Sequence, residues 1–131
     1  MELNMKKIVI AIILVVVAIG CIDPYCNYII DKGFEENKPN KCLSGALIKQ
    51  RMFKYRSSIS TYKKMIKKFP NFDELDRVHY YMAHCYEKDD NAKRAIEVYE
   101  NFIATFPKSD FIEKAKKKLS NLKANSETDD I

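Results

Sequence analysis

The sequence predicts an all-α protein built from repeated helix pairs, and three observations support that prediction. The chain of 131 residues contains only 3 Gly and 4 Pro, too few for a loop-rich β-sandwich. Apolar residues recur at helical spacing along most of its length. Much of the sequence over 55–86 also returns 37 positions later. A chain of this length has room for one small domain or a short array of repeats, which excludes large two-domain enzymes.

The first twenty residues have the pattern of an export signal. Lys6 and Lys7 precede an uncharged apolar run of 13 residues, from Ile8 to Gly20. As a helix this run reaches about 20 Å, short of the ~30 Å hydrocarbon core of a bilayer. A basic start followed by a short apolar run is typical of a signal peptide. We therefore expect residues 1–20 to be a cleaved signal peptide, and Cys21 directly after them favours a lipoprotein signal peptide.

Cys21 follows the apolar run directly. This arrangement resembles the lipobox of bacterial lipoproteins, although the lipobox usually has Leu at the position of Ala18. The resemblance implies that Cys21 receives a diacylglycerol thioether and becomes the new N-terminus. Two acyl chains give stable membrane attachment, at ~0.8 kcal/mol for each buried methylene. The alternatives are ordinary secretion and an uncleaved anchor.

Residues 21–40 are expected to form a lipid-anchored tether. They show no lasting hydrophobic period, and Pro39 disfavours helix just before it. An exported chain lies in a compartment that permits disulfides, so Cys26 and Cys42 could pair, and this question stays open at the level of sequence. Cys85 is expected to be a small buried apolar residue.

The repeat domain is expected to span 41–124 and to contain two copies of one unit. A shift of 37 positions places Phe69-Pro70 on Phe106-Pro107, and the positions on both sides agree. In the first copy, apolar residues step by four and three positions, as on one face of an α-helix. These residues are Tyr55, Ile59, Tyr62, Ile66 and Phe69. Pro70 and Pro107 end the helices, since proline lacks the amide that a continuing helix needs.

This pattern predicts five helices in the domain, the last one capping the array. Their expected ranges are about 42–53, 55–69, 75–88, 92–105 and 111–123. Residues 125–131 are polar and are expected to form a disordered tail.

The spacing of small and aromatic residues resembles that of tetratricopeptide repeats. The matching positions are Ala83, Tyr86, Ala95, Tyr99, Phe102 and Pro107. The unit is three residues longer than the usual ~34, and the extra residues lie in the turn after each Phe-Pro. With the lipoprotein-like signal ahead of it, the chain resembles the BamD/ComL family of outer-membrane lipoproteins over roughly residues 42–123. That family usually carries more repeats than fit here.

The resemblance implies a non-catalytic scaffold of the outer-membrane β-barrel protein assembly (BAM) machinery. It would be lipid-anchored at the periplasmic face of the bacterial outer membrane, where it would bind assembly subunits such as a BamA-like protein or client proteins. Two alternatives stay open. One is another envelope scaffold, either a Tol–Pal/CpoB-like division factor or a pilus-assembly lipoprotein. The other is a peripheral element that binds lipid or cell wall.

A binding groove is expected along the first helix of each pair. The tetratricopeptide register places Arg77 and Tyr80 on the exposed stripe of the 75–88 helix, and both residue types are common at binding hot spots. The expected groove consists of Leu43, Leu47, Gln50, Arg77, Tyr80, His84, Glu87, Lys114 and Lys117. The alternative is that these residues are only solvated helix surface.

The segment from Asn37 through Phe72 contains ten basic residues and no acidic one. The expected basic patch consists of Lys49, Arg51, Lys54, Arg56, Lys63, Lys64, Lys67 and Lys68. Such a patch could meet anionic head groups or an acidic protein, or be a solvated lysine face. Nucleic-acid binding is disfavoured because the aromatic residues lie on the apolar stripe rather than among the lysines.

The sequence offers little support for catalysis. It has no serine elbow, no glycine-rich phosphate loop and no metal-ligand spacing. His84 and Cys85 are adjacent on a helix and point roughly 100° apart, which prevents them from acting as a nucleophile–base pair. We therefore expect no enzymatic activity, no cofactor, no small-molecule substrate and no metal.

Overall fold

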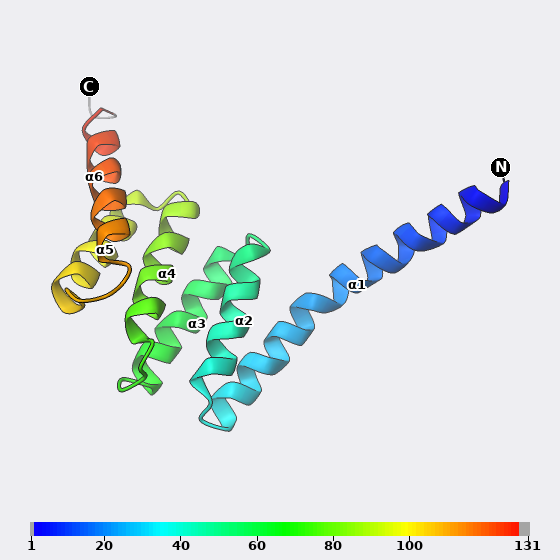
Figure 1. Ribbon diagram of the computed structural model, residues 1–131, viewed down its shortest axis with the longest axis horizontal. Coiled ribbons are helices and arrows are strands. Elements are labelled where there is room, and N and C mark those ends of the chain that lie inside the picture. Colours follow the sequence, from blue (N-terminus) through cyan, green and yellow to red (C-terminus); the bar gives the residue numbers. More distant parts are fainter. Residues whose placement is uncertain (1, 129–131) are drawn as a thin grey trace.

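The computed structural model describes residues 2–128, with side chains from 4 to 126, and this part of the chain is entirely helical outside its turns. Its elements are α1 (Glu2–Glu35), α2 (Pro39–Arg51), α3 (Tyr55–Lys68), α4 (Leu75–Lys88), α5 (Ala92–Thr105) and α6 (Ile112–Thr128), shown in Figure 1. The predicted all-α fold class is confirmed.

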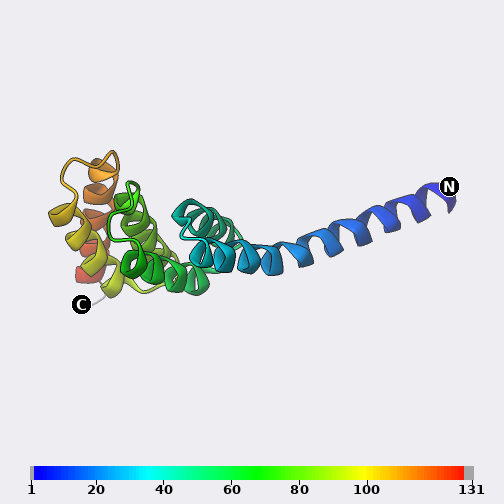
Figure 2. The ribbon, with the colours of Figure 1, turned by 90° about the horizontal axis from the view of Figure 1, so that it is seen from below.

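The helices form a two-layer stack in which each helix packs mainly on its neighbours in the chain. Helices α2 to α6 run alternately up and down, while the N-terminal half of α1 projects away from them (Figures 1 and 2). Side chains also join alternate helices: Gln50 of α2 to His84 of α4, and Glu87 of α4 to Lys118 of α6. Helices α2, α4 and α6 therefore share one layer, as in helical solenoids.

The duplication seen in the sequence is also a duplication of geometry. Phe69 ends α3 with φ −123° and ψ 60°, and Phe106 ends α5 with φ −123° and ψ 58°. The backbone amide of Phe69 donates to the carbonyl oxygen of Met65, and that of Phe106 to Phe102, each at 2.8 Å. The two turns after the Phe-Pro pairs are thus built alike. The predicted helices over 75–88 and 92–105 have these same bounds in the structure.

The buried tyrosines repeat at the same interval. The Tyr62 hydroxyl donates to Gln50 Oε1, and the Tyr99 hydroxyl donates to Glu87 Oε2, both at 2.9 Å. Both rings are fully buried, each in one of the two core clusters of the stack. In each unit the tyrosine therefore ties the second helix of a pair to a polar side chain on the first.

The expectation of a tether over 21–40 is wrong for most of that segment. Helix α1 continues through Pro24 to Glu35, and its second half packs against α2. Cys26 and Ile30 are buried there, together with Gly33. Only a short turn separates the two helices. Pro39 then opens α2 in its first turn, where a missing amide hydrogen costs nothing.

Two glycines allow α1 and α2 to approach closely. A Cβ atom on Gly33 would lie 2.6 Å from Cys42 Sγ and 2.9 Å from the Cys42 backbone nitrogen. A Cβ atom on Gly45 would lie 2.5 Å from Ile30 Cγ1. Real Cβ contacts are longer than these distances, so any side chain at either position would push the helices apart.

Cys26 and Cys42 are free thiols, which settles the open question of their pairing. Cys42 faces Gly33, seven residues beyond Cys26 and so about 10 Å further along α1. A disulfide needs a much shorter separation. Burial raises the pKa of Cys42 to about 11 and that of Cys85 to about 12, so both thiols stay protonated and unreactive. Cys85 is a buried core residue, as expected.

The last helix is longer than predicted. Helix α6 begins at Ile112 and continues to Thr128, beyond the expected end near Lys123. The expectation of a disordered tail from 125 is therefore wrong for 125–128. Residues 129–131, the rest of that expected tail, lie outside the described residues.

Candidate protein-binding surfaces

Helices α2, α4 and α6 present a row of polar side chains with two contacts between helices, and we call it the α2–α4–α6 face. Gln50 Nε2 lies 3.0 Å from His84 Nδ1, which joins α2 to α4. Lys118 Nζ lies 2.9 and 3.0 Å from the two carboxylate oxygens of Glu87, which joins α4 to α6. Three residues of the predicted groove, Gln50, His84 and Glu87, are thus brought together.

The protonation of this row follows from its hydrogen bonds. Because the Tyr62 hydroxyl donates to Gln50 Oε1, the amide group of Gln50 points toward His84. With the amide in this orientation, Nδ1 of His84 accepts a hydrogen bond and is unprotonated. Burial, and then the positive charge of Lys118, lower the pKa of His84. His84 is therefore neutral at pH 7.

Glu87 is held in its charged form. Burial alone would raise its pKa, but hydrogen bonds from Lys118 and Tyr99 outweigh burial and lower it. The residue of α6 that pairs with Glu87 is Lys118. Lys117, which was predicted to line the groove, is exposed. The repeat in the sequence could have revealed this row. The pair Tyr99–Glu87 lies 37 positions after the pair Tyr62–Gln50, so the two pairs occupy equivalent positions of the unit.

Two predicted groove residues are buried instead, so their placement in a groove is wrong. Tyr80 is 7% exposed, and its ring stacks on Phe111 at 4.7 Å between centroids. Leu43 is 4% exposed and belongs to the core cluster that includes Tyr62. A tyrosine one position along, Tyr81, is only partly buried, and it packs against both core clusters.

Cations lie over aromatic rings near the N-terminal ends of α4 and α6. The Arg77 guanidinium lies 5.7 Å from the centroid of the Tyr81 ring and pairs with Glu74 at 2.7 Å. Lys114 Nζ lies 5.9 Å from the centroid of Phe111. Such pairs combine apolar area with charge, which is the combination that protein-binding hot spots favour. Leu47, the remaining predicted groove residue, is half-buried.

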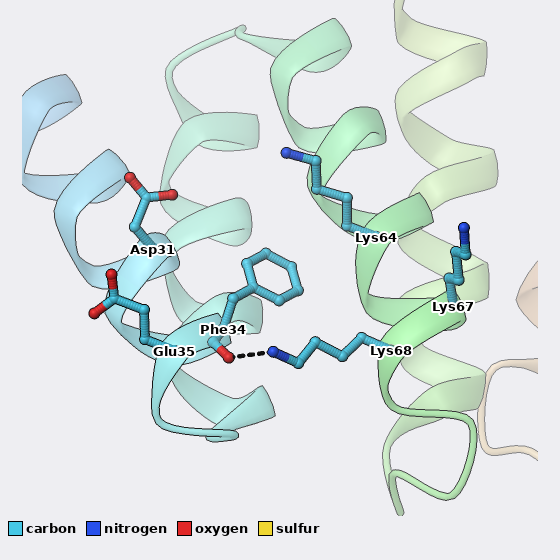
Figure 3. Close-up of a pocket in the computed structure, with 6 residues that line it drawn as sticks. All are labelled: Asp31, Phe34, Glu35, Lys64, Lys67 and Lys68. Carbon is cyan, nitrogen blue, oxygen red and sulfur yellow. Dashed lines mark hydrogen bonds between the residues drawn. The ribbon is translucent and has the colours of Figure 1, made fainter.

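A second surface is the open groove between α1 and α3 (Figure 3). Asp31, Phe34 and Glu35 line it from α1, and Lys64, Lys67 and Lys68 line it from α3. Lys68 Nζ donates to the Phe34 carbonyl oxygen across the groove. The Phe34 ring also stacks on Phe69 at 5.8 Å. Acidic and basic walls thus face each other here over an aromatic ring.

The predicted basic patch is not one continuous surface. Lys49 is only 5% exposed, so its assignment to a surface patch is wrong. Its Nζ donates to Asn27 Oδ1 and, at 2.9 Å, to Ser57 Oγ. Burying an ammonium group is costly unless it is hydrogen-bonded in this way.

The other basic residues divide into two groups. Arg51, Lys54 and Arg56 lie around the turn between α2 and α3; Lys54 pairs with Asp23 at 2.7 Å, and Arg56 pairs with Asp89 at 3.0 Å. The second group is on α3 and consists of Lys63, Lys64, Lys67 and Lys68. The two groups lie at different places on the stack and need not share a partner.

The N-terminal half of α1 is apolar and exposed. Residues 4–21 are exposed throughout, and Cys21 is among them. By length and composition the helix over Asn4–Glu35 could cross a membrane. Signal sequences near the N-terminus meet the same two criteria. Residues that pack on the stack all follow Cys21 within the described part of α1. Processing at Cys21 would therefore leave the folded stack intact.

A model of a known family matches part of the chain. Residues 77–109 match the tetratricopeptide repeat, and they cover most of α4, all of α5 and the turn after it. A search of curated proteins found no match to the chain. Since α2 and α3 repeat the geometry of α4 and α5, the stack has tetratricopeptide-repeat character, which is typical of non-catalytic scaffolds that bind other proteins.

Proposed function

We propose that this protein is a membrane-attached, non-catalytic scaffold that binds a protein partner on the α2–α4–α6 face. The observation that carries the proposal is the pairing of side chains between helices on this face, Gln50 with His84 and Glu87 with Lys118. It holds side chains of three helices in one arrangement before any partner binds. Preorganisation of this kind lowers the entropy cost of association.

The attachment is proposed to be a lipid on Cys21. The support is the lipobox-like order of residues and the exposure of this cysteine just before the packed half of α1. Acylated Cys21 would lie two residues before Asp23, which forms ion pairs with the stack. The repeat domain would therefore sit close to the bilayer.

The finer assignment is to β-barrel protein assembly at the periplasmic face of the outer membrane, with a BamA-like subunit or a client protein as the partner. Its support is the resemblance of the sequence over 95–107, which ends in the Phe-Pro pair, to the BamD/ComL family. Ile22 after the cysteine is compatible with sorting to the outer membrane. A Tol–Pal-type or pilus-assembly scaffold is the alternative.

Affinity purification of the full-length chain after mild crosslinking tests the partner and the surface together. The double variant Arg77→Glu/Lys114→Glu should lose the partner, because it reverses two charges on the α2–α4–α6 face. The matched variant Lys64→Glu/Lys67→Glu changes the net charge equally on α3 and should retain it. The opposite result would move the site to the groove between α1 and α3. Absence of every barrel-assembly subunit would refute the BAM assignment.

Fatty-acid labelling and mass spectrometry of the mature N-terminus test the anchor. Wild-type protein should carry the acyl mass on Cys21, and Cys21→Ala should not be labelled. An unmodified Cys21 would remove the lipoprotein proposal and leave the scaffold proposal to be judged by the purification alone.

A further inference from the structure

The turn between α2 and α3 lies beside the point where α1 leaves the stack. Lys54 Nζ is 2.7 Å from Asp23 Oδ2, and Lys49 Nζ is 3.8 Å from Asp23 Oδ1. Asp23 directly follows the last apolar residue of the N-terminal segment, Ile22. Whether α1 remains whole or begins at an acylated Cys21, this turn is brought to the lipid–water interface.

Phe53 stands in this turn with an unusually exposed ring. Its side chain is 78% exposed, and its backbone has φ 61°. The other non-glycine residues with positive φ in the described part of the chain are Asn37 and Asp90. Asn and Asp tolerate this conformation, whereas a bulky residue there is strained. Neither the conformation nor contact with water explains why a phenylalanine occupies this position.

The packing of the Phe53 ring within the protein is slight. Its centroid lies 6.2 Å from that of Tyr55, in an edge-on arrangement. The amide of Phe53 bonds to the Gln50 carbonyl oxygen at 3.1 Å, and the amide of Lys54 to that of Lys49 at 3.0 Å. Any residue except proline could make such backbone bonds. The turn is therefore fixed by its backbone, which holds the ring outward.

Basic residues flank Phe53 in the sequence. Arg51 and Arg56 are exposed, and Lys54 is 42% exposed. Phe is among the apolar residues that bury at the boundary between head groups and acyl chains, and Arg or Lys near the surface adds attraction to anionic lipid. An exposed ring between cations, beside the root of an apolar helix, has the chemistry of an interfacial membrane contact.

We propose that Phe53, with Arg51 and Lys54, inserts into the head-group region of the membrane that holds the N-terminus. This inference rests on the proposed membrane attachment and goes beyond it. One attachment point leaves the stack free to swing, whereas a second contact at the α2–α3 turn sets its tilt. The α2–α4–α6 face is then held at a fixed angle to the bilayer.

Tryptophan fluorescence tests the contact cleanly, because the chain contains no Trp. Phe53→Trp is compared with Asn71→Trp, an exposed position in the turn between α3 and α4 at the opposite end of the stack. Each full-length variant is bound to vesicles of phosphatidylethanolamine and phosphatidylglycerol. We expect emission from Trp at 53 to shift to the blue and to be quenched by brominated lipid, and emission from Trp at 71 to do neither.

The outcomes separate this contact from the proposed function. If the protein floats with the vesicles while Trp at 53 keeps a water-like, unquenched emission, the contact is overturned and the membrane attachment stands. If the protein does not float, both the membrane attachment and the contact are overturned. Partner capture in the crosslinking experiment is independent of either result.

A stability measurement on a second variant checks the strain argument. Phe53→Gly should raise the melting temperature of the protein in solution, since glycine adopts positive φ without strain. It should also loosen the stack on vesicles, seen as a wider spread of distances from the membrane to a label at position 71. A lower melting temperature would show that Phe53 is retained for the fold, and would overturn the proposal.

Discussion

The two halves of α1 belong to one unbroken helix but have opposite relations to the rest of the protein. Residues 8–20 are almost entirely apolar and exposed, while residues 23–35 are rich in polar side chains and pack against α2. The polar half packs because its three buried residues, Cys26, Ile30 and Gly33, fall on one face at spacings of four and three. Hydropathy therefore identifies the exposed apolar half, and the spacing of small residues identifies the half that belongs to the fold.

Truncation gives the largest effect expected from this comparison. Removing residues 1–22 should leave the melting temperature of the stack unchanged. Removing residues 1–35 takes away the buried side chains of α1 and uncovers apolar side chains on α2, at ~1.5–3 kcal/mol each. The summed loss, on the order of 5–10 kcal/mol, equals the whole stability of a small domain. Circular dichroism during heating should then show no cooperative transition, and a sharp transition in this shorter chain would contradict the comparison.

A matched pair of isoleucines sharpens the comparison within one helix. Ile30 is 6% exposed and Ile19 is 54% exposed. Ile30→Ala should lower the free energy of unfolding by about 2–5 kcal/mol, through lost burial and the cavity left behind. Ile19→Ala should change it by less than about 0.5 kcal/mol. Urea denaturation of the two full-length variants measures both values, and equal losses would show that the halves do not differ.

A matched pair of glycines tests the close approach of α1 and α2. Gly33→Ala should destabilise the protein by about 1–3 kcal/mol, because the new methyl group would overlap the Cys42 backbone. A Cβ atom on Gly20 would meet no atom within 4 Å in the described part of the chain, so Gly20→Ala should not destabilise it. The melting temperatures decide the matter: a Gly33→Ala protein as stable as wild type would mean that the helices lie further apart.

The smallest effect concerns the turn that follows the packed half. Hydrogen bonds from Lys41 and Lys38 lower the pKa of Glu36 to about 2. A carboxylate with a depressed folded pKa stabilises the fold above its unfolded value of about 4.5, and this contribution disappears as the pH falls toward 2. Glu36→Gln should therefore reduce slightly the loss of stability between pH 7 and pH 3. Identical acid denaturation curves for the two proteins would show that these ion pairs contribute nothing.

The sequence was sufficient to predict α4 and α5 with their bounds, and α3 to within one residue. Two copies of the unit confirm each other, and the Phe-Pro pairs mark where the second helix of each unit ends. The packed half of α1 was missed because only Ile30 among its three buried positions is a large apolar residue. Cysteine and glycine carry little hydrophobic signal, although they let the helices approach closely.

The α2–α4–α6 face was predicted only in part. Tyr80 and Tyr81 are adjacent on α4 and point about 100° apart, so an error of one position exchanges a buried ring for a half-exposed one. The pairing of Glu87 with Lys118 depends on how far α6 is displaced along α4, and periodicity within a single helix does not report that displacement.

Amide hydrogen exchange of the chain beginning at Asp23 tests most directly whether the repeat stack starts inside α1. We expect the amides over 26–35 to exchange as slowly as those of α2, because the side chains of this segment pack on that helix. Exchange over 26–35 as fast as in the last turns of α6 would contradict it, and would return this segment to the role of a tether.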